Sequence, residues 1–223
     1  MMSWLESLKR DLLEITQAEA LTYWPPFQSY TLPSFNERLE HVKHVEKNAM
    51  KLHKIYGGDI DVILASVWIH DRAKFEPGDH AAHASDWALL NLCKTDFPEH
   101  KIKEVADAVQ VHSGWVTKDI HSVEAKILWD ADKLSHFGPA YFMDSIFSFT
   151  SEKICERENQ PDIIRFHETI SMDNFLLKLK EFKNGLDNDR MDHMFYFDES
   201  KRLVRKYINA NIAFYEVLEE QFQ

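Results

Sequence analysis

The chain is short of the residues that characterise secreted and membrane-spanning proteins. Only two cysteines occur among its 223 residues, Cys93 and Cys155, so a framework of disulfide bonds is excluded and the cytoplasm is the expected location. The longest apolar stretches, such as residues 62–69, fall far below the roughly 20 residues of a membrane-spanning helix. The N-terminal segment contains acidic residues and no long apolar run, which predicts an amphipathic helix and not a signal peptide. Cys93 falls on an apolar helical face and is expected to be a core thiol.

Basic residues are also few relative to acidic ones. Lys and Arg total 26 against 37 Asp and Glu, which gives a formal net charge of −11. Such a chain is a poor general binder of nucleic-acid polymers or anionic membranes, so we expect neither as a partner. It can still bind a small phosphorylated molecule where local cations or a metal ion offset the field. The sequence also allows a homodimer.

Glycine and proline are scarce, with six and seven residues, and helical periodicity dominates. No convincing strand pattern, internal repeat or linker occurs, so we predict an all-α fold in a single domain, residues 1–223. Ser34 is the expected N-cap of the second helix, with Glu37 completing a capping box, and Gly57 and Gly58 end that helix. The expected helices lie at residues 1–20, 35–55, 61–70, 79–93, 98–111, 123–135, 140–156, 161–186 and 197–220.

Three short motifs on separate predicted helices carry residues that bind metals. His70 and Asp71 end an apolar helix, although a lone His-Asp pair is weak information because the dipeptide is common. His41 lies on the preceding helix, and Asp132 lies on a later one. The helices of a bundle can bring such groups to one point, where neutral imidazoles and carboxylates suit a divalent transition metal or magnesium.

Over residues 39–140 this order of motifs resembles the HD superfamily of metal-dependent phosphohydrolases. In that family the first ligand histidine is followed at helical spacing by a branched apolar residue and an alanine, as His41 is by Val45 and Ala49. The family's His-Asp pair follows an apolar helix that contains alanine, which residues 65–71 match. The last ligand lies in an Ala-Asp-x-Leu element, and residues 131–134 match it.

The resemblance implies a single HD-domain helical bundle with additional N- and C-terminal helices. Its HD core is expected at about residues 36–140 and its C-terminal helical extension at about residues 141–223. One or two divalent ions (Mn, Fe, Ni, Mg, Co or Zn) are expected, with the ligands His41, His70, Asp71 and Asp132. In the family, Gly-Lys commonly follows two residues after the His-Asp pair. Here Lys74 supplies the lysine, while Ala73 replaces the glycine.

Neighbouring residues compete for two of these ligand positions. His44 lies one turn from His41, and the apolar register that follows favours His41. Asp130 competes with Asp132, and the Ala-Asp-x-Leu register favours Asp132. Asp130 is then expected to support the ligands from outside or to be solvated. The remaining histidines lack a supporting context: His53, His100, His121, His136, His167 and His193.

A subset of HD proteins holds a second metal through two further histidines between the His-Asp pair and the last aspartate. His112 ends its helix as the second of these histidines does, and either His80 or His83 could supply the first. The small residues that follow favour His80. Asp71 would then bridge both ions. The alternative is that these histidines bind the substrate phosphate or merely pack.

The implied activity is hydrolysis of a phosphoester or phosphoanhydride, in a nucleotide or a related small metabolite, by a metal-activated water. Asp71 would orient the water as well as bind the metal, and Lys74 and Arg72 would bind the phosphoryl oxygens. Two alternatives belong to other classes: an HD-fold di-iron oxygenase, and a non-catalytic HD regulatory module. The metal separates the hydrolase from the oxygenase, and the intact ligand set argues against the regulatory module.

Overall fold

The structure, a computed structural model, describes residues 3–23, 36–74, 76–138 and 193–222. Every regular element in these ranges is a helix, which confirms the all-α prediction. Two short 3-10 turns, Leu92–Lys94 and Glu99–Lys101, lie between α4 and α5. The α-helices are α1 (Trp4–Tyr23), α2 (Glu37–Tyr56), α3 (Ile60–Ile69), α4 (His80–Asn91), α5 (Ile102–Val111), α6 (Val123–Ser135) and α11 (Asp198–Phe222).

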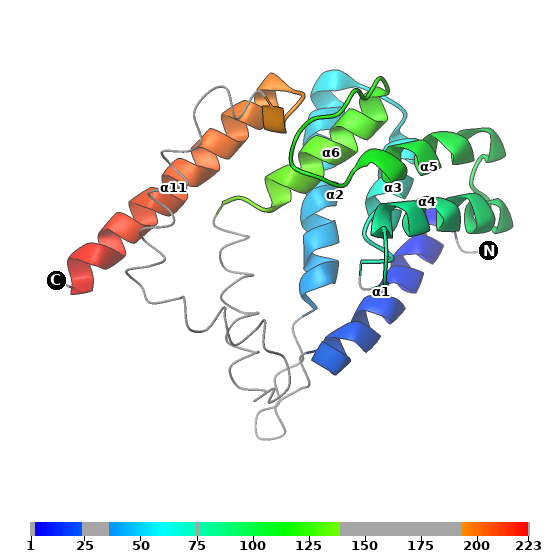
Figure 1. Ribbon diagram of the computed structural model, residues 1–223, viewed down its shortest axis with the longest axis horizontal. Coiled ribbons are helices and arrows are strands. Elements are labelled where there is room, and N and C mark those ends of the chain that lie inside the picture. Colours follow the sequence, from blue (N-terminus) through cyan, green and yellow to red (C-terminus); the bar gives the residue numbers. More distant parts are fainter. Residues whose placement is uncertain (1–2, 24–35, 75, 139–192, 223) are drawn as a thin grey trace.

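The helices form a bundle around α2, α3 and α6. Figure 1 shows α2 and α6 side by side in the middle of the molecule, with α4 and α5 on one side and α11 extending away on the other. Helix α3 contacts α1, α2, α5 and α6, and a smaller contact joins it to α4. The chain therefore folds so that α3 has neighbours on several sides, as its apolar sequence predicts.

Most helix limits agree with the sequence prediction to within a few residues. The helix predicted at residues 123–135 coincides with α6, and Gly57 ends α2 with a φ of 76°. The helices predicted at residues 140–156 and 161–186 lie outside the described residues. The division into an HD core and a C-terminal extension stays a prediction.

The residues that cap the helices explain where these begin. Asn36 precedes α2, and its side chain accepts a hydrogen bond from the Leu39 N–H at 3.1 Å. The prediction of Ser34 as this cap is therefore wrong. Both residue types can cap a helix, and it is Asn36 that lies directly before the first turn. Side chains of Asp59, Asp79 and Ser122 accept N–H groups at the starts of α3, α4 and α6.

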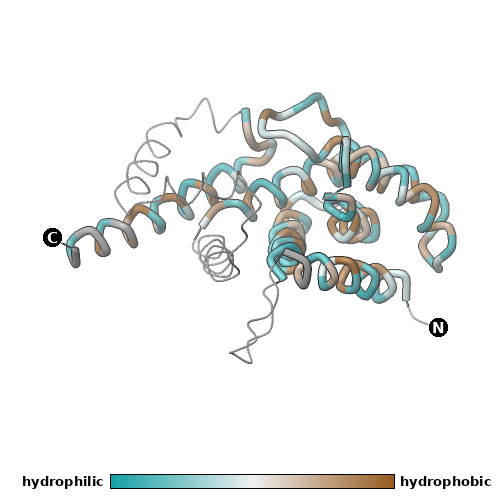
Figure 2. The backbone as a smooth tube through the Cα atoms, turned by 60° about the horizontal axis from the view of Figure 1, so that its bottom comes forward, coloured by the Kyte–Doolittle hydropathy of each residue, from teal (hydrophilic) through white to brown (hydrophobic). Residues whose placement is uncertain are grey.

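The core is densest along α3. Val62, Ile63, Ala65, Val67 and Ile69 are fully buried there, and Trp129 of α6 is the largest fully buried side chain. Figure 2 shows teal and brown positions alternating along most of the other helices, which is the pattern of amphipathic helices with one apolar face. Burying these apolar side chains is the main source of the stability of the bundle.

The structure bears on the expectations about Cys93 and about membrane-spanning helices. Cys93 is exposed, so its assignment to the core is wrong. Its neighbour Leu92 is fully buried and occupies the inward position of this 3-10 turn instead. Within the described part of the chain, no helix has both the length and the apolar character needed to cross a membrane.

Candidate metal centre

The predicted ligands meet at a point where α2, α6 and the end of α3 come together. His41 Nε2 lies 3.3 Å from Asp132 Oδ1 and 3.6 Å from Asp71 Oδ2. His70 Nε2 lies 3.8 Å from Asp71 Oδ2 and 3.9 Å from Asp132 Oδ1. Two donor atoms on one ion, each at about 2.1 Å, are separated by roughly 3.0–4.2 Å, depending on the angle between them. The observed separations fall in this range.

Hydrogen bonds on the outer side of each ring fix which nitrogen carries the proton. His70 Nδ1 lies 2.7 Å from the Val67 carbonyl oxygen, which can only accept, so Nδ1–H donates. Ser135 Oγ donates its one hydrogen to the Asp132 carbonyl oxygen at 2.6 Å. His41 Nδ1, 3.1 Å from that Oγ, must therefore donate to it. In both rings the Nε2 lone pair is left free and faces the carboxylates, as in histidines that bind metals.

This arrangement places acceptors against acceptors. The two Nε2 atoms of His41 and His70 are 3.4 Å apart, and carboxylate oxygens surround both. Burial lowers the pKa of His70 to about 3, so its ring stays neutral. Burial also acts to lower the pKa of His41, but the hydrogen bond and charge of Asp132, with the charge of Asp71, raise it. The carboxylates thus favour positive charge at this point, and a divalent cation supplies it.

A second group of ligand atoms lies on the other side of Asp71. Asp71 Oδ1 is 3.6 Å from His80 Nε2 and 3.7 Å from His112 Nε2. His112 Nδ1 donates to the Val109 carbonyl oxygen at 2.6 Å, so its Nε2 lone pair is also free. The buried Nε2 of His80 has no hydrogen-bond partner among the described residues. We call His41, His70 and Asp132 the first group and Asp71, His80 and His112 the second group. Together they are the histidine–aspartate centre.

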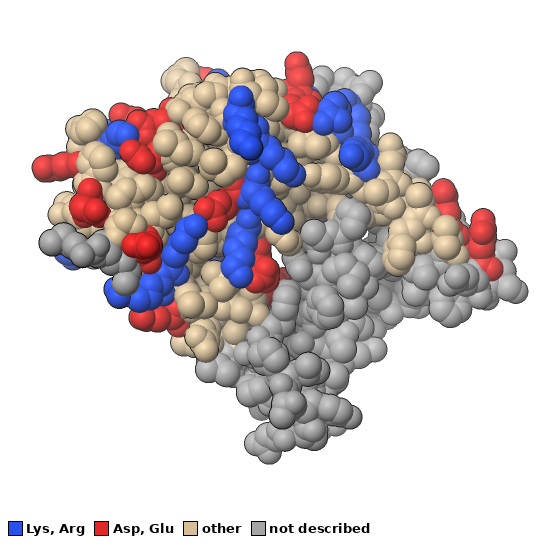
Figure 3. All heavy atoms as spheres, turned by 180° about the vertical axis from the view of Figure 1, so that it is seen from behind, with Lys and Arg blue, Asp and Glu red and all other residues tan. Residues whose placement is uncertain are grey.

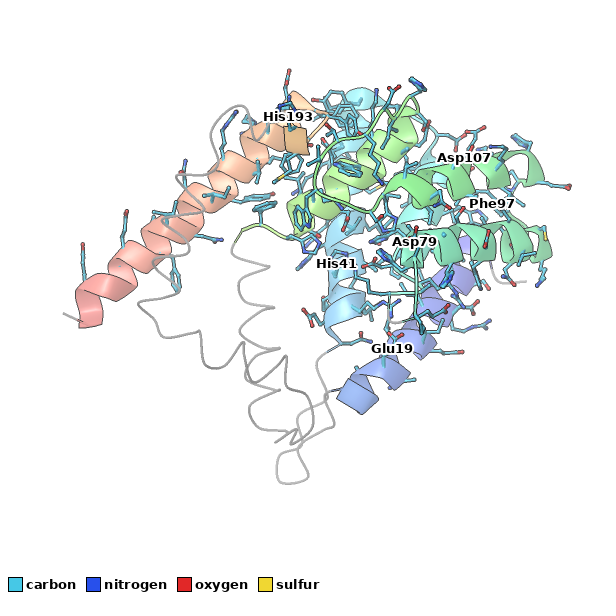
Figure 4. The ribbon with its side chains drawn as sticks, in the orientation of Figure 1. Glu19, His41, Asp79, Phe97, Asp107 and His193 are labelled. Carbon is cyan, nitrogen blue, oxygen red and sulfur yellow. The ribbon has the colours of Figure 1, made fainter. Side chains whose placement is uncertain are left out.

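Asp71 joins the two groups because its two oxygens face opposite ways. Oδ2 faces the first group, and Oδ1 faces the second. Burial acts to raise its pKa, but the neighbouring imidazoles and Lys74 hold it well below the usual value, so the carboxylate is charged. The geometry suits a carboxylate that bridges two ions. Figure 4 shows His41 on α2 and Asp79, the residue before His80, at the end of α4 that is nearest to α2.

The structure also separates the competing residues. His83 Nδ1 lies 3.4 Å from Glu76 Oε2, whereas His80 Nε2 lies 3.6 Å from Asp71 Oδ1. His44 lines a pocket of about 210 Å³ together with Lys47, Ser135 and Tyr207, and it is absent from both groups of ligand atoms. His80 and His41 are therefore the residues placed in the histidine–aspartate centre.

Comparison with solved structures identifies the arrangement of helices. A predicted HD superfamily hydrolase from an uncultured Thermotogales bacterium has a TM-score of 0.57 and 18% identity, covering 96% of this chain and 92% of that one. The chain has the HD-domain fold. An HD-superfamily hydrolase from Bacillus thuringiensis is similar, with a TM-score of 0.53, 18% identity and coverage of 96% and 98%. No family model and no curated protein matches the sequence.

Within the HD-domain fold, Asp130 faces away from the histidine–aspartate centre. Its two carboxylate oxygens accept the backbone N–H groups of Tyr196 and Phe197, each at 2.9 Å, and the side chain is fully buried. Burial raises its pKa to about 6 despite these hydrogen bonds. The expectation of a solvated residue or an outer support for the ligands is therefore wrong. Asp130 fixes the segment that leads into α11.

Two cations contact the carboxylates of the histidine–aspartate centre. Lys74 Nζ lies 3.3 Å from Asp71 Oδ1, and its side chain is 45% exposed. Lys133 Nζ lies 2.5 Å from Asp132 Oδ2 and donates to the His112 carbonyl oxygen, and it is buried. Figure 3 shows Lys and Arg side chains gathered in the middle of the face opposite to that of Figure 1. Helical geometry places the exposed Lys43 and Lys47 on the side of α2 turned away from His41.

Arg72 lies apart from these cations. Its guanidinium stacks on the Trp87 ring at 3.9 Å. Burial lowers its pKa, while the carboxylates of Asp11 and Glu76 act against this shift. A role of Arg72 in binding substrate stays a prediction.

Sequence reasoning missed three residues that contact the ligands. His136 Nε2 lies 3.6 Å from Asp132 Oδ1, and its ring is 5.0 Å from that of His41. Its position four residues after Asp132, at the end of α6, is the indication that the sequence offers. The same reasoning overlooked the ion pair of Lys133 with Asp132. Arg38 donates to the Asp71 carbonyl oxygen and pairs with Glu19, so it holds the turn after α3.

Proposed function

We propose that the protein is a metal-dependent phosphohydrolase of a small, nucleotide-like phosphoester or phosphoanhydride. The observation that carries the proposal is Asp71, whose two oxygens each face a set of imidazole nitrogens with free lone pairs. Deprotonated carboxylates and neutral imidazoles are the ligands that divalent metals require. The donor set therefore fits one or two such ions.

The ligands would divide between two ions. His41, His70, Asp71 and Asp132 would hold the first, while Asp71, His80 and His112 would hold the second. A divalent ion there would lower the pKa of water and offset negative charge on phosphoryl oxygens. The oxygen of water would form a bond to phosphorus as the bond from phosphorus to the leaving oxygen breaks. The leaving oxygen would take up the proton that the attacking water releases, so that the step balances.

The protein's own side chains supply the rest of the chemistry. Asp71 would accept a hydrogen bond from the attacking water and orient it. Lys74 Nζ, half exposed beside Asp71, would bind a phosphoryl oxygen. The side chains of His80 and His136 are 24% and 30% exposed, whereas His70 is fully buried. Lys74, His80 and His136 are thus the partly exposed residues around the histidine–aspartate centre, and a phosphate could reach the centre beside Lys74 and His80.

The test combines metal analysis with phosphate release from a panel of nucleotides. We expect the purified protein to bind one or two divalent ions per chain and to release phosphate with Mn²⁺, Mg²⁺ or Ni²⁺. Asp71→Asn should lose metal and fall to the background rate, because it removes a charge that both ions share. Asp107→Asn changes an exposed carboxylate paired with Lys103, and it should behave as wild type.

Three outcomes would contradict the proposal. Oxygen uptake by a protein loaded with paired iron would favour the HD-fold oxygenase instead. A protein that binds no metal and turns over no substrate would favour the non-catalytic regulatory module. Full activity in Asp71→Asn, with the metal retained, would show that this carboxylate is not the shared ligand.

A further inference from the structure

The loop that follows α5 presents an exposed tryptophan beside the histidine–aspartate centre. Trp115 and Val116 are 51% and 65% exposed. The loop is held just after them, where Thr117 N–H donates to the His193 carbonyl oxygen at 2.7 Å. Lys118 N–H donates to the Tyr196 hydroxyl at 2.8 Å, and that hydroxyl donates to the Lys118 carbonyl oxygen at 2.6 Å. Trp115 and Val116 therefore lie on a supported segment of the loop.

Ring contacts connect Trp115 to the ligands. Its ring centroid lies 5.4 Å from that of His136, and His136 Nε2 lies 3.6 Å from Asp132 Oδ1. The Trp115 ring also packs edge-on against Phe137 at 6.4 Å. A half-exposed indole is thus one imidazole away from a carboxylate of the first group, on the side where His136 is open to solvent.

Packing covers only part of the Trp115 side chain. Lys133 Nζ lies 4.9 Å from the Trp129 ring and 5.5 Å from the Trp115 ring. Trp129 is fully buried and covers the cation on its side, but Trp115 leaves about half of its surface in water. Exposed aromatic surface beside a polar centre can bind a planar ligand group, because stacking removes apolar surface of both partners from water.

We propose that Trp115 stacks on a planar aromatic ring of the substrate, such as a nucleobase, while the phosphate of the same molecule binds beside Lys74. The inference builds on the phosphohydrolase proposed above and names the class of its substrate, a phosphate ester that carries a flat ring. His136, between Trp115 and Asp132, would lie against the connecting part of the molecule.

The experiment compares ligands that differ only in the ring. Each nucleoside 5′-monophosphate and ribose 5-phosphate share the same primary phosphoester, so the difference between their Kd values reports the base. Titration calorimetry with protein loaded with a divalent ion that gives no phosphate release, such as Ca²⁺, should show tighter binding of at least one nucleotide. Trp115→Ala should weaken that nucleotide by at least about fivefold, the low end for removal of a base-stacking aromatic, and leave ribose 5-phosphate within about twofold.

Two further variants separate stacking from a structural role. Trp115→Phe should keep most of the preference for the base, because a flat ring remains. Val116→Ala removes the neighbouring exposed apolar side chain and should leave both ligands unchanged. A general disturbance of the Lys133–Asp132 pair would weaken both ligands equally in Trp115→Ala. That result would overturn the inference.

Failure of the inference can be distinguished from failure of the proposed function. If no nucleotide binds more tightly than ribose 5-phosphate, Trp115 has no stacking role, whether or not phosphate is released. If the base preference depends on Trp115 but no ligand loses phosphate with Mn²⁺, Mg²⁺ or Ni²⁺, the hydrolase proposal is wrong and the binding site remains.

Discussion

Single protons on ring nitrogens determine whether the histidine–aspartate centre can bind a metal. His41, His70 and His112 each donate their Nδ1 proton outward and turn a free Nε2 lone pair inward. Two of the three acceptors are backbone carbonyl oxygens, which a substitution cannot remove. The third is the Ser135 hydroxyl. A single substitution of Ser135 can therefore remove the hydrogen bond that orients His41.

We predict that Ser135→Ala lowers metal affinity by about 10- to 100-fold, the usual effect of removing an outer hydrogen-bond partner of a ligand histidine. The physical reason is that His41 loses the acceptor that fixes its proton on Nδ1. Competition with a chelator measures the affinity. Ser66→Ala is the matched control, because Ser66 Oγ is also buried but has no hydrogen-bond partner among the described residues. Equal affinities in the two variants would contradict the prediction.

At this scale the motifs indicated the six residues of the histidine–aspartate centre, and the structure brings those residues together. The motifs did not indicate Lys133 or Trp115. Lys133 follows a ligand directly, and its inward orientation depends on the burial of a cation between two indole rings. Trp115 is placed by hydrogen bonds between its loop and residues 193 and 196, far away in the sequence. No local pattern encodes such a contact.

Among the elements, α6 links the histidine–aspartate centre to α11. Asp130 and Asp132 are two residues apart, which corresponds to about 200° around a helix, so they face opposite sides. Asp132 faces the imidazoles, whereas Asp130 accepts the N–H groups of Tyr196 and Phe197 before α11. Two residues of α6 therefore have separate roles: Asp132 belongs to the histidine–aspartate centre, and Asp130 fixes the segment before α11.

Stability and metal binding should respond separately to substitution of these two residues. Asp130→Asn places an NH₂ group against a backbone N–H, so we expect the free energy of unfolding to fall by about 1–3 kcal/mol. Chemical denaturation in the presence of EDTA measures this without a contribution from metal. Asp130→Asn should keep its metal when folded, and Asp132→Asn should lose it. Loss of metal in both variants, at equal stability, would refute the division.

The helices themselves were largely predictable. Apolar periodicity and the turn residues give α6 its observed limits, and Gly57 ends α2 as expected. The start of α2 was misplaced because Ser34 and Asn36 are both good caps, and only the position of the first turn decides between them. The role of Asp130 could not be predicted, because its partners lie more than sixty residues away.

On the scale of the whole molecule, the histidine–aspartate centre joins five helical segments. Its residues come from α2, the end of α3, the start of α4, the end of α5 and α6. An ion bound there would add a direct link between these segments. The metal would therefore stabilise the fold as well as act in the reaction.

We predict that Mn²⁺ raises the melting temperature of EDTA-treated protein. At 100 times its Kd, one ion that binds only the folded state adds about 2.7 kcal/mol. That free energy corresponds to a shift of about 5–10 °C for a chain of this size. Differential scanning fluorimetry measures the shift, and Asp71→Asn should show little of it. An unchanged melting temperature in wild-type protein that metal analysis shows to be loaded would rule out this stabilising role.

The bonds from His70 to the Val67 carbonyl and from His112 to the Val109 carbonyl share one form, a ring at the end of a helix reaching back three residues along its own backbone. Every amino acid provides that oxygen. The side chains at positions 67 and 109 can therefore change, as far as packing allows, while both imidazole rings keep their orientation. Substitutions at these two buried positions could therefore accumulate during evolution without changing the orientation of either ligand.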